Sequence, residues 1–231
     1  MKKILYLPVI LSLFFTLSFA QSGNKKSTLP GTVADNYGLK SWPAVTSISF
    51  TFNVKAGKIN VKRSWKWEPG SGLVEYSGPG ENGKDTVISY NRNNLDKKQE
   101  FIISVDKKFI NDSYWLLFPF HLVWDNNVDI KDEGISDSPI THSKDRTLVV
   151  QYINNVGYTP NDEFVLYLNK NNMIKEWIYR PGGSKEKERA YTWEGNKNFN
   201  GITISTEHNG PNKKTKVWFT GIEVETNHRD K

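Results

Sequence analysis

Hydrophobic and polar residues alternate along much of the chain beyond residue 47, a pattern typical of strands with one buried face. Residues 48–54 place Ile and Phe side chains on one face and Ser, Thr and Asn side chains on the other. After the turn signal Ala56-Gly57, residues 59–67 alternate in the same way, and Arg63, Trp65 and Trp67 share the face of Ile59 and Val61. The two segments together predict an antiparallel hairpin.

Further segments of this kind predict two more strands before residue 91 and six after residue 146. The expected strands are Leu73–Tyr76, Thr86–Tyr90, Thr147–Ile153, Glu163–Leu168, Met173–Arg180, Arg189–Glu194, Ile202–His208 and Lys216–Glu225. Turn signals rich in Asn, Gly and Pro separate nearly all of them, including Gly195-Asn196. Short strands at this spacing predict an antiparallel meander of about nine or ten strands.

Two segments have helical spacing instead. Residues 31–37 form a candidate short helix ended by Gly38. Apolar residues recur at four-residue intervals from Phe101, which predicts a central helical insert reaching Pro119, and Asp112 could cap a second helix beginning at Ser113. Residues 125–146 are expected to be mainly loop with a short strand.

The N-terminus has the three parts of a secretory signal peptide. Lys2 and Lys3 precede an apolar stretch over residues 4–17, and Ser18-Phe19-Ala20 offers small residues at the cleavage positions. The apolar stretch is shorter than the ~20 residues that cross a bilayer, and no later stretch is apolar enough to do so. We therefore predict cleavage near Ala20 and a soluble periplasmic or secreted protein with no integral membrane span.

The expected organisation is a signal peptide over residues 1–20, a flexible lead-in over 21–30, one β-rich domain over 31–226 and a polar tail over 227–231. The formal charge of +6 falls to +4 once Lys2 and Lys3 are removed. Because the remaining charges are mixed in sign, we expect no nucleic-acid partner. The chain has no cysteine, so the fold rests on its core, and lipid anchoring through cysteine, thiol catalysis and cysteine-ligated metals are excluded.

Several stretches resemble the LolA/LolB-like lipoprotein-carrier superfamily, especially its uncharacterised secreted relatives. They are Gly38 to Trp42, Trp42-Pro43 leading into Ile48–Val54, Arg63 to Trp67, Phe109 to Pro119 and Gly201 to Ile204. The resemblance spans roughly residues 31–225. It implies an antiparallel open half-barrel with the helical insert over its concave face, an apolar concavity that shelters acyl chains, and an inward arginine at the place of Arg63. The Trp-rich stretches and the missing anchor cysteine depart from the carriers.

Arg63 and the tryptophans are the candidate ligand-binding residues. An arginine on an apolar face is suited to anchoring an anionic head group, but it is equally suited to a cation–π contact or a salt bridge. The eight tryptophans fill a core or line a ligand site. The candidates for a ligand site are Arg63, Trp65, Trp67, Trp115, His121, Trp124 and Trp177.

His121, Asp125, Asp129, Asp132 and Glu133 form the densest group of ionisable residues. They lack the spacing of a calcium loop, and the four histidines contain no H-x-x-x-H pair. No nucleophile motif of the G-x-S-x-G kind is present either. We therefore expect no metal, no cofactor and no catalysis, with a hydrolase built on His121 to Glu133 as the less favoured alternative.

The sequence thus predicts a non-catalytic exported protein that holds a lipid, another hydrophobic molecule or a lipidated partner in a half-barrel. The alternative is a cell-envelope interaction or glycan-binding module, which would have exposed tryptophan on the convex side or a closed, filled interior. The sequence does not define the oligomeric state.

Overall fold

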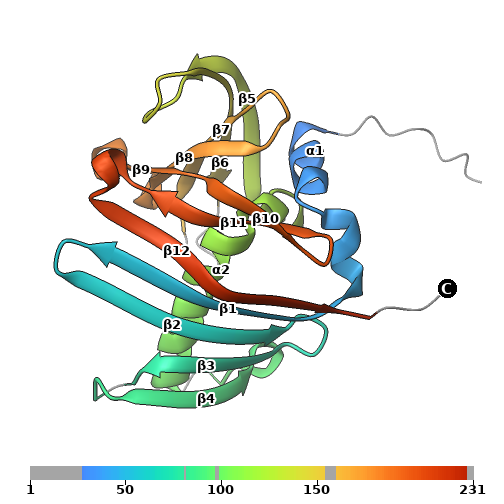
Figure 1. Cartoon of the computed structure of the whole chain (residues 1–231), viewed down its shortest axis with the longest axis vertical. Coiled ribbons are helices and arrows are strands. Elements are labelled where there is room, and N and C mark those ends of the chain that lie inside the picture. Colours follow the sequence, from blue (N-terminus) through green and yellow to red (C-terminus); the bar gives the residue numbers. More distant parts are fainter. Residues whose placement is uncertain (1–27, 81, 97–98, 154–159, 228–231) are drawn as a thin grey trace, which may run out of the picture.

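The computed structural model describes residues 28–80, 82–96, 99–153 and 160–227 (Figure 1). The predicted signal peptide and most of the lead-in lie outside the described residues, as does most of the polar tail. Within the described chain, helix α1 begins at Leu29, two residues before the expected start of the domain.

The larger of two antiparallel sheets has seven strands in the order β10-β11-β12-β1-β2-β3-β4. Its strands are β1 (Val45–Ala56), β2 (Ile59–Glu68), β3 (Leu73–Pro79), β4 (Asp85–Asn91), β10 (Glu194–Phe199), β11 (Ile202–Asn209) and β12 (Thr215–Thr226). The predicted hairpin is confirmed, because Ala56 pairs with Ile59 and Phe52 pairs with Arg63. The first and last long strands, β1 and β12, are neighbours in the middle of this sheet.

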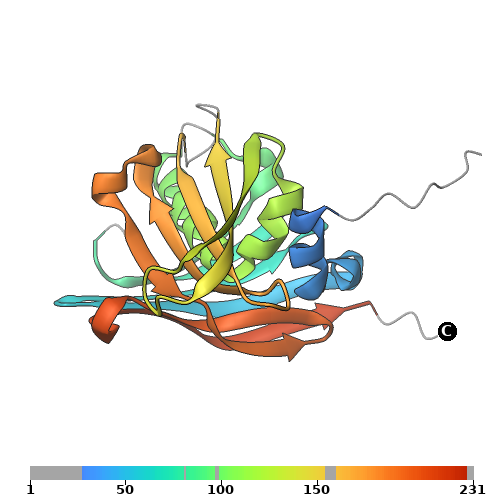
Figure 2. The same ribbon diagram turned by 90° about the horizontal axis from the view of Figure 1, so that it is seen from above.

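The smaller sheet is a meander of five strands in chain order. It consists of β5 (Val128–Asp137), β6 (Lys144–Tyr152), β7 (Glu163–Leu168), β8 (Ile174–Arg180) and β9 (Arg189–Thr192). The two sheets stand at an angle to one another, with the central helix between them (Figure 2). The described strands do not close into a barrel, so the expected mainly β, antiparallel open half-barrel with a helical insert is confirmed.

Helix α1 (Leu29–Asn36) and the 3-10 helix η1 (Leu39–Ala44) cover one end of the molecule. Gly38 between them has φ +97°, and a Cβ atom there would collide with the carbonyl oxygen of Gly201. Beside this contact, the backbone N–H of Thr203 donates to the carbonyl of Tyr37 (2.9 Å). Glycine at position 38 therefore lets the end of α1 dock against the β10–β11 hairpin. Four shorter 3-10 turns are η2 (Arg92–Asn94), η3 (Pro181–Gly183), η4 (Lys185–Lys187) and η5 (Pro211–Lys213).

The central insert is one helix, α2 (Glu100–Trp124), of 25 residues. The expected second helix capped by Asp112 is wrong, since Asp112 lies in the middle of α2, with its side chain fully buried. The irregularity comes later, at Leu117, whose backbone departs from helical angles two residues before Pro119. Proline lacks an N–H and crowds the carbonyl four residues earlier, which is that of Trp115.

The twelve described strands exceed the expected nine or ten because β10 was missed and β5 was expected only as a short strand within a loop. Residues 125–146, expected to be mainly loop, contain the ten residues of β5, and Gly195-Asn196 lies inside β10 rather than at a turn. Both are edge strands whose side chains are mostly exposed, so they carry little hydrophobic alternation. A register shift between Asp132 and Gly134 also interrupts the alternation of side chains along β5.

One continuous hydrophobic core joins both sheets and α2. Phe50, Phe52 and Trp65 supply it from the large sheet, Leu148, Leu166 and Trp177 from the small sheet, and Phe109, Leu116 and Phe118 from α2. The helix therefore fills most of the concave space. Among the described helices, none combines the length and apolarity that a membrane crossing requires.

Candidate functional site

A pocket of about 170 Å³ remains between one side of α2 and strands β7 and β8. Its apolar walls are Ile110, Trp115, Phe164 and Trp177. The stacking of Phe164 on Trp177, with ring centroids 5.2 Å apart, and the edge-on approach of Trp115 to Trp177 at 4.8 Å make these walls largely aromatic. Such concave, aromatic-lined spaces are the usual form of small-molecule sites.

The lining of this pocket also includes polar groups on both sides. Lys107 and Asn111 lie one turn apart on α2, and Asp162 and Tyr179 face them from the small sheet. The Asp162 carboxylate accepts the hydroxyl of Tyr179 (2.9 Å) and the backbone N–H of Gly182 (2.7 Å). These bonds hold the Asp162 and Tyr179 side chains in place on the sheet side of the pocket. On the helix side, Lys107 contributes an ammonium group and Asn111 an amide.

Two of the predicted site residues, Trp115 and Trp177, therefore meet in the pocket. Trp115 belongs to α2 and Trp177 to β8, and the two residues are 62 positions apart in the chain. Trp177 is 1% exposed. Sequence reasoning missed Ile110, Phe164 and Tyr179, which line the same space. The i, i+4 spacing of Lys107, Asn111 and Trp115 along the helix was the available signal for the helical half of the lining.

His121 belongs to a polar network at the end of α2, next to the pocket wall formed by Tyr114. Its Nδ1 lies 3.1 Å from the Asp125 carboxylate, which also accepts the hydroxyls of Tyr114 (2.8 Å) and Tyr152 (2.6 Å). Burial by itself raises the pKa of Asp125, but the hydrogen bonds from His121, Tyr152 and Tyr114 hold it below its usual range. Burial and the neighbouring Tyr114 and Asp125 raise the pKa of Tyr152, so it stays a hydrogen-bond donor.

The His121–Asp125 pair tests the hydrolase alternative. A hydrolase would need two or three of His121, Asp125, Asp129 and Glu133 to converge in a cleft. The structure brings His121 and Asp125 together, whereas Asp129 pairs with Lys131 (3.3 Å) and Asp132 pairs with Arg146. Glu133 is exposed. Within the described ranges, no three His, Asp or Glu side chains gather closely enough to hold a metal ion. The network thus orients His121 and caps α2.

Trp124 and Trp67 lie in a second aromatic group around Trp42. The centroid of Trp42 is 4.8 Å from that of Trp124 and 5.7 Å from that of Trp67. Trp67 also meets Phe109 edge-on at 5.6 Å. This group packs η1 against α2 and β2, and its members are not part of the pocket lining.

Arg63 faces inward, as the resemblance implied, but its guanidinium is engaged by Asp112. Arg63 Nε and Nη2 donate to the two carboxylate oxygens at 2.7 and 2.6 Å, and Trp65 Nε1 donates to one of them at 2.9 Å. The guanidinium also lies 4.9 Å from the centroid of Phe52. Burial raises the pKa of Asp112, and Arg63 opposes that rise. This arrangement joins α2 to β2 and combines the salt bridge and cation–π contact that the sequence left open.

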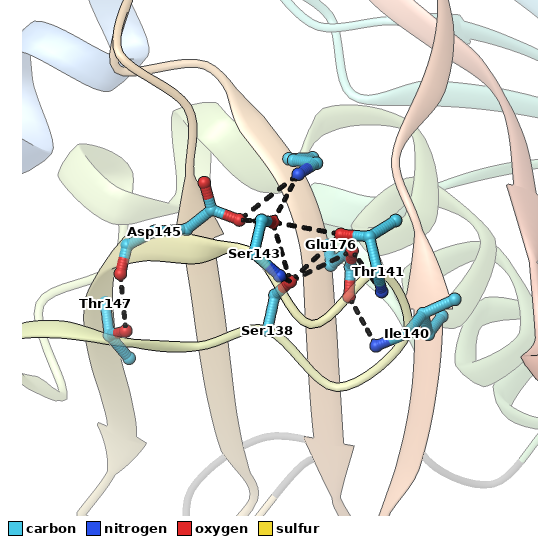
Figure 3. Close-up of polar contacts among 8 residues, drawn as sticks. Ser138, Ile140, Thr141, Ser143, Asp145, Thr147 and Glu176 are labelled. Atoms are coloured by element: carbon cyan, nitrogen blue, oxygen red, sulfur yellow. Dashed lines mark hydrogen bonds and ion pairs between the residues drawn. The ribbon is translucent and has the colours of Figure 1, made fainter.

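A second polar cluster lies around the turn between β5 and β6 (Figure 3). The buried Glu176 carboxylate accepts the backbone N–H groups of Ile140 (2.8 Å) and Thr141 (3.1 Å) and the hydroxyl of Ser138 (3.2 Å). Next to it, Ser143 donates to Asp145 (2.5 Å) and contacts Lys175.

This cluster has serine and lysine in contact but not the conditions for nucleophilic catalysis. Lys175 Nζ lies 3.3 Å from the Asp145 carboxylate, which also accepts the Ser143 hydroxyl, so both side chains are engaged by the same carboxylate. The backbone N–H groups nearby are already bound to Glu176. The cluster therefore fastens the β5–β6 turn to β8.

Comparisons with known proteins place the chain only distantly. No protein-family model matches it, and no curated protein matches its sequence. Among solved structures, a DUF1329 family protein from Desulfovibrio piger is similar with a TM-score of 0.44 and 13% identity, over 88% of this chain and 96% of that one. The Mycobacterium tuberculosis lipoprotein LppX is similar with a TM-score of 0.31 and 6% identity, over 85% of this chain and 96% of that one.

Proposed function

We propose that this protein binds a hydrophobic molecule in the pocket between α2 and β8 and carries out no chemistry on it. The observation that carries the proposal is the aromatic lining of that pocket by Trp115, Phe164 and Trp177. Apolar surface that enters such a space gains ~25 cal/mol per Å² buried. The polar members of the lining suit a ligand that also carries a polar group.

The size of the pocket limits the part of the ligand that it takes up. A dry cavity of ~150 Å³ holds a benzene molecule, and the pocket measures about 170 Å³. It therefore suits one ring or the end of an alkyl chain, because α2 occupies the space in which a whole acyl chain would otherwise lie. Trp115 and Trp177 would contact the ligand, whereas Arg63, Trp65, Trp67, His121 and Trp124 would hold α2 in place beside it.

The proposal is tested by filling the pocket. Ile110 lines it, so Ile110→Trp places an indole in the space, whereas Val123→Trp adds the same side chain at a position of α2 that is 45% exposed. We expect titration of N-phenyl-1-naphthylamine to show an affinity reduced by about tenfold or more in Ile110→Trp, a loss of ~1.4 kcal/mol, and an unchanged affinity in Val123→Trp. Equal affinities in the two variants, or no binding to the wild type, would sink the proposal.

We also propose that the protein acts outside the cytoplasm, in the periplasm or as a secreted protein. The support is the sequence of residues 1–20, in which two lysines, an apolar stretch and small residues follow one another in the order that signal peptidase substrates have.

A further inference from the structure

The outer face of the large sheet, which is the face turned away from α2, carries a single aromatic side chain on β12, β1, β2 and β3. Val217 and Phe219 are buried, so the intervening Trp218 of β12 points outward, and it is partly exposed. Within these four fully described strands, no other outward position is aromatic. Packing of the hydrophobic core does not account for an indole on this outer face.

The neighbours of Trp218 on the outer face are polar and ordered by the strand register. Trp218 lies opposite Asn53 of β1 and Glu207 of β11. Two residues further along β12, Thr220 lies opposite Thr51 of β1. Thr51 in turn lies opposite Ser64 of β2. The Asn53 amide donates to the Thr220 hydroxyl (3.2 Å), and the hydroxyls of Thr51 and Ser64 are 2.9 Å apart. This region thus presents hydroxyl, amide and charged groups around one indole, with Lys62 opposite Asn53 and Glu207 opposite Trp218.

A hollow of about 440 Å³ adjoins Trp218 because β11 and β12 separate. Their ladder contains only three pairs, from Glu207–Trp218 to Asn209–Lys216. Beyond them the strands diverge until the Asn200 side chain donates to the carbonyl of Val224 (2.6 Å). Phe199 and Ile222 line the hollow together with Thr206 and Thr220.

An exposed ion pair lies beside Trp218, with its cation over the indole ring. Lys216 Nζ is 2.8 Å from the Glu207 carboxylate and 5.7 Å from the centroid of the Trp218 ring. The two side chains are 36% and 46% exposed. A hydrogen-bond donor and an acceptor therefore lie together beside an aromatic face, and both remain accessible to a ligand.

We propose that Trp218 and this hollow form a saccharide-binding subsite. A pyranose ring has an apolar face of C–H groups that can cover an indole, and hydroxyls around its edge that both donate and accept hydrogen bonds. Glu207 accepts such bonds, Lys216 donates them, and the Thr220 hydroxyl, which accepts from the Asn53 amide, can donate. The subsite is separate from the pocket beside α2 and does not depend on the function proposed for it.

The test measures binding of cellohexaose, chitohexaose and maltoheptaose to the mature protein by isothermal titration calorimetry. We expect at least one sugar to bind, Trp218→Ala to weaken its binding about tenfold or more, and Glu207→Gln to weaken it less. Val87→Ala is the matched control, because Val87 of β4 is 75% exposed. Circular dichroism establishes that each variant is folded, and Phe199→Ala serves as a second probe of the hollow.

Three outcomes overturn the proposal: none of the sugars binds, Trp218→Ala binds as well as the wild type, or Val87→Ala is weakened equally. Competition by an extended peptide that pairs with the free edges of β11 and β12 provides a further check, since a peptide that binds there while sugars do not identifies a strand-addition site instead. Because Ile110→Trp leaves this surface unchanged, it should keep full sugar affinity, which distinguishes failure of this proposal from failure of the pocket.

Discussion

His208 of β11 is a titratable residue with no exposed surface, packed among aromatic rings. It lies 4.2 Å from the ring of Trp193 and 5.4 Å from that of Trp115, and its Nδ1 is 3.2 Å from the carbonyl oxygen of Thr192. Burial lowers its pKa from 6.5 to about 3, although the carbonyls of Thr192 and Trp115 oppose the shift. The side chain is therefore neutral in the folded protein at pH 7.

This burial makes the stability of the protein depend on pH. Between pH 6.5 and 3 the unfolded chain binds a proton at His208 that the folded chain does not, so the free energy of unfolding falls as the pH falls through that window. We expect the wild type to lose about 2–3 kcal/mol from this group between pH 7.5 and 4.5. Urea unfolding of His208→Gln should show a flatter pH profile, and His142→Gln, at an exposed position, should match the wild type. Parallel profiles for His208→Gln and the wild type would contradict this prediction.

At the scale of elements, the docking of α1 and η1 onto the β10–β11 hairpin depends on Gly38. Any side chain there meets both a φ of +97° and the carbonyl of Gly201. The β1–β2 turn offers a natural comparison, since Gly57 has φ +57° and no atom within 4 Å of an added Cβ. Substitutions at the two positions therefore separate the energetic cost of backbone strain from that of steric overlap.

We therefore expect Gly38→Ala to lower the free energy of unfolding by about 3 kcal/mol, from left-handed strain plus overpacking. Gly57→Ala should cost only about 1 kcal/mol, from the strain alone. Chemical denaturation of both variants measures the difference. Equal losses would show that the close approach of Gly38 to Gly201 does not constrain the fold.

Element boundaries also show where the sequence was informative. Strands with one buried face, such as β1 and β2, were predicted because alternation is strong when the core takes every second side chain. The edge strand β10 was missed and β5 was expected only as a short strand, because backbone pairing rather than side-chain burial makes them strands. Helix α2 was predicted as a helix but divided at Asp112, since a buried carboxylate inside a helix has no signature other than its distant partner Arg63.

At the scale of the whole molecule, both sheets and α2 share one core, and the small pocket is what that packing leaves open. The first buried residue of the described core is Val33.

We expect protein recovered from outside the cytoplasm to begin at Gln21, because cleavage after Ala20 follows the small residues of Ser18-Phe19-Ala20. N-terminal sequencing or intact mass spectrometry of that fraction checks the prediction. Replacement of Ala20 by Arg should block cleavage and serves as the control. Recovery of the uncleaved chain in the cytoplasm alone would contradict it.

The sequence by itself determined the antiparallel β class, the central helix, the absence of cysteine chemistry and the aromatic richness of the interior, because these follow from local periodicity and composition. Only the tertiary structure decided which partners the key residues have. It paired Arg63 with Asp112 across 49 positions, brought Trp115 to Trp177, and separated β11 from β12 beside Trp218. Such juxtapositions depend on how sheets and helix pack, a long-range property that the pattern of any single segment does not contain.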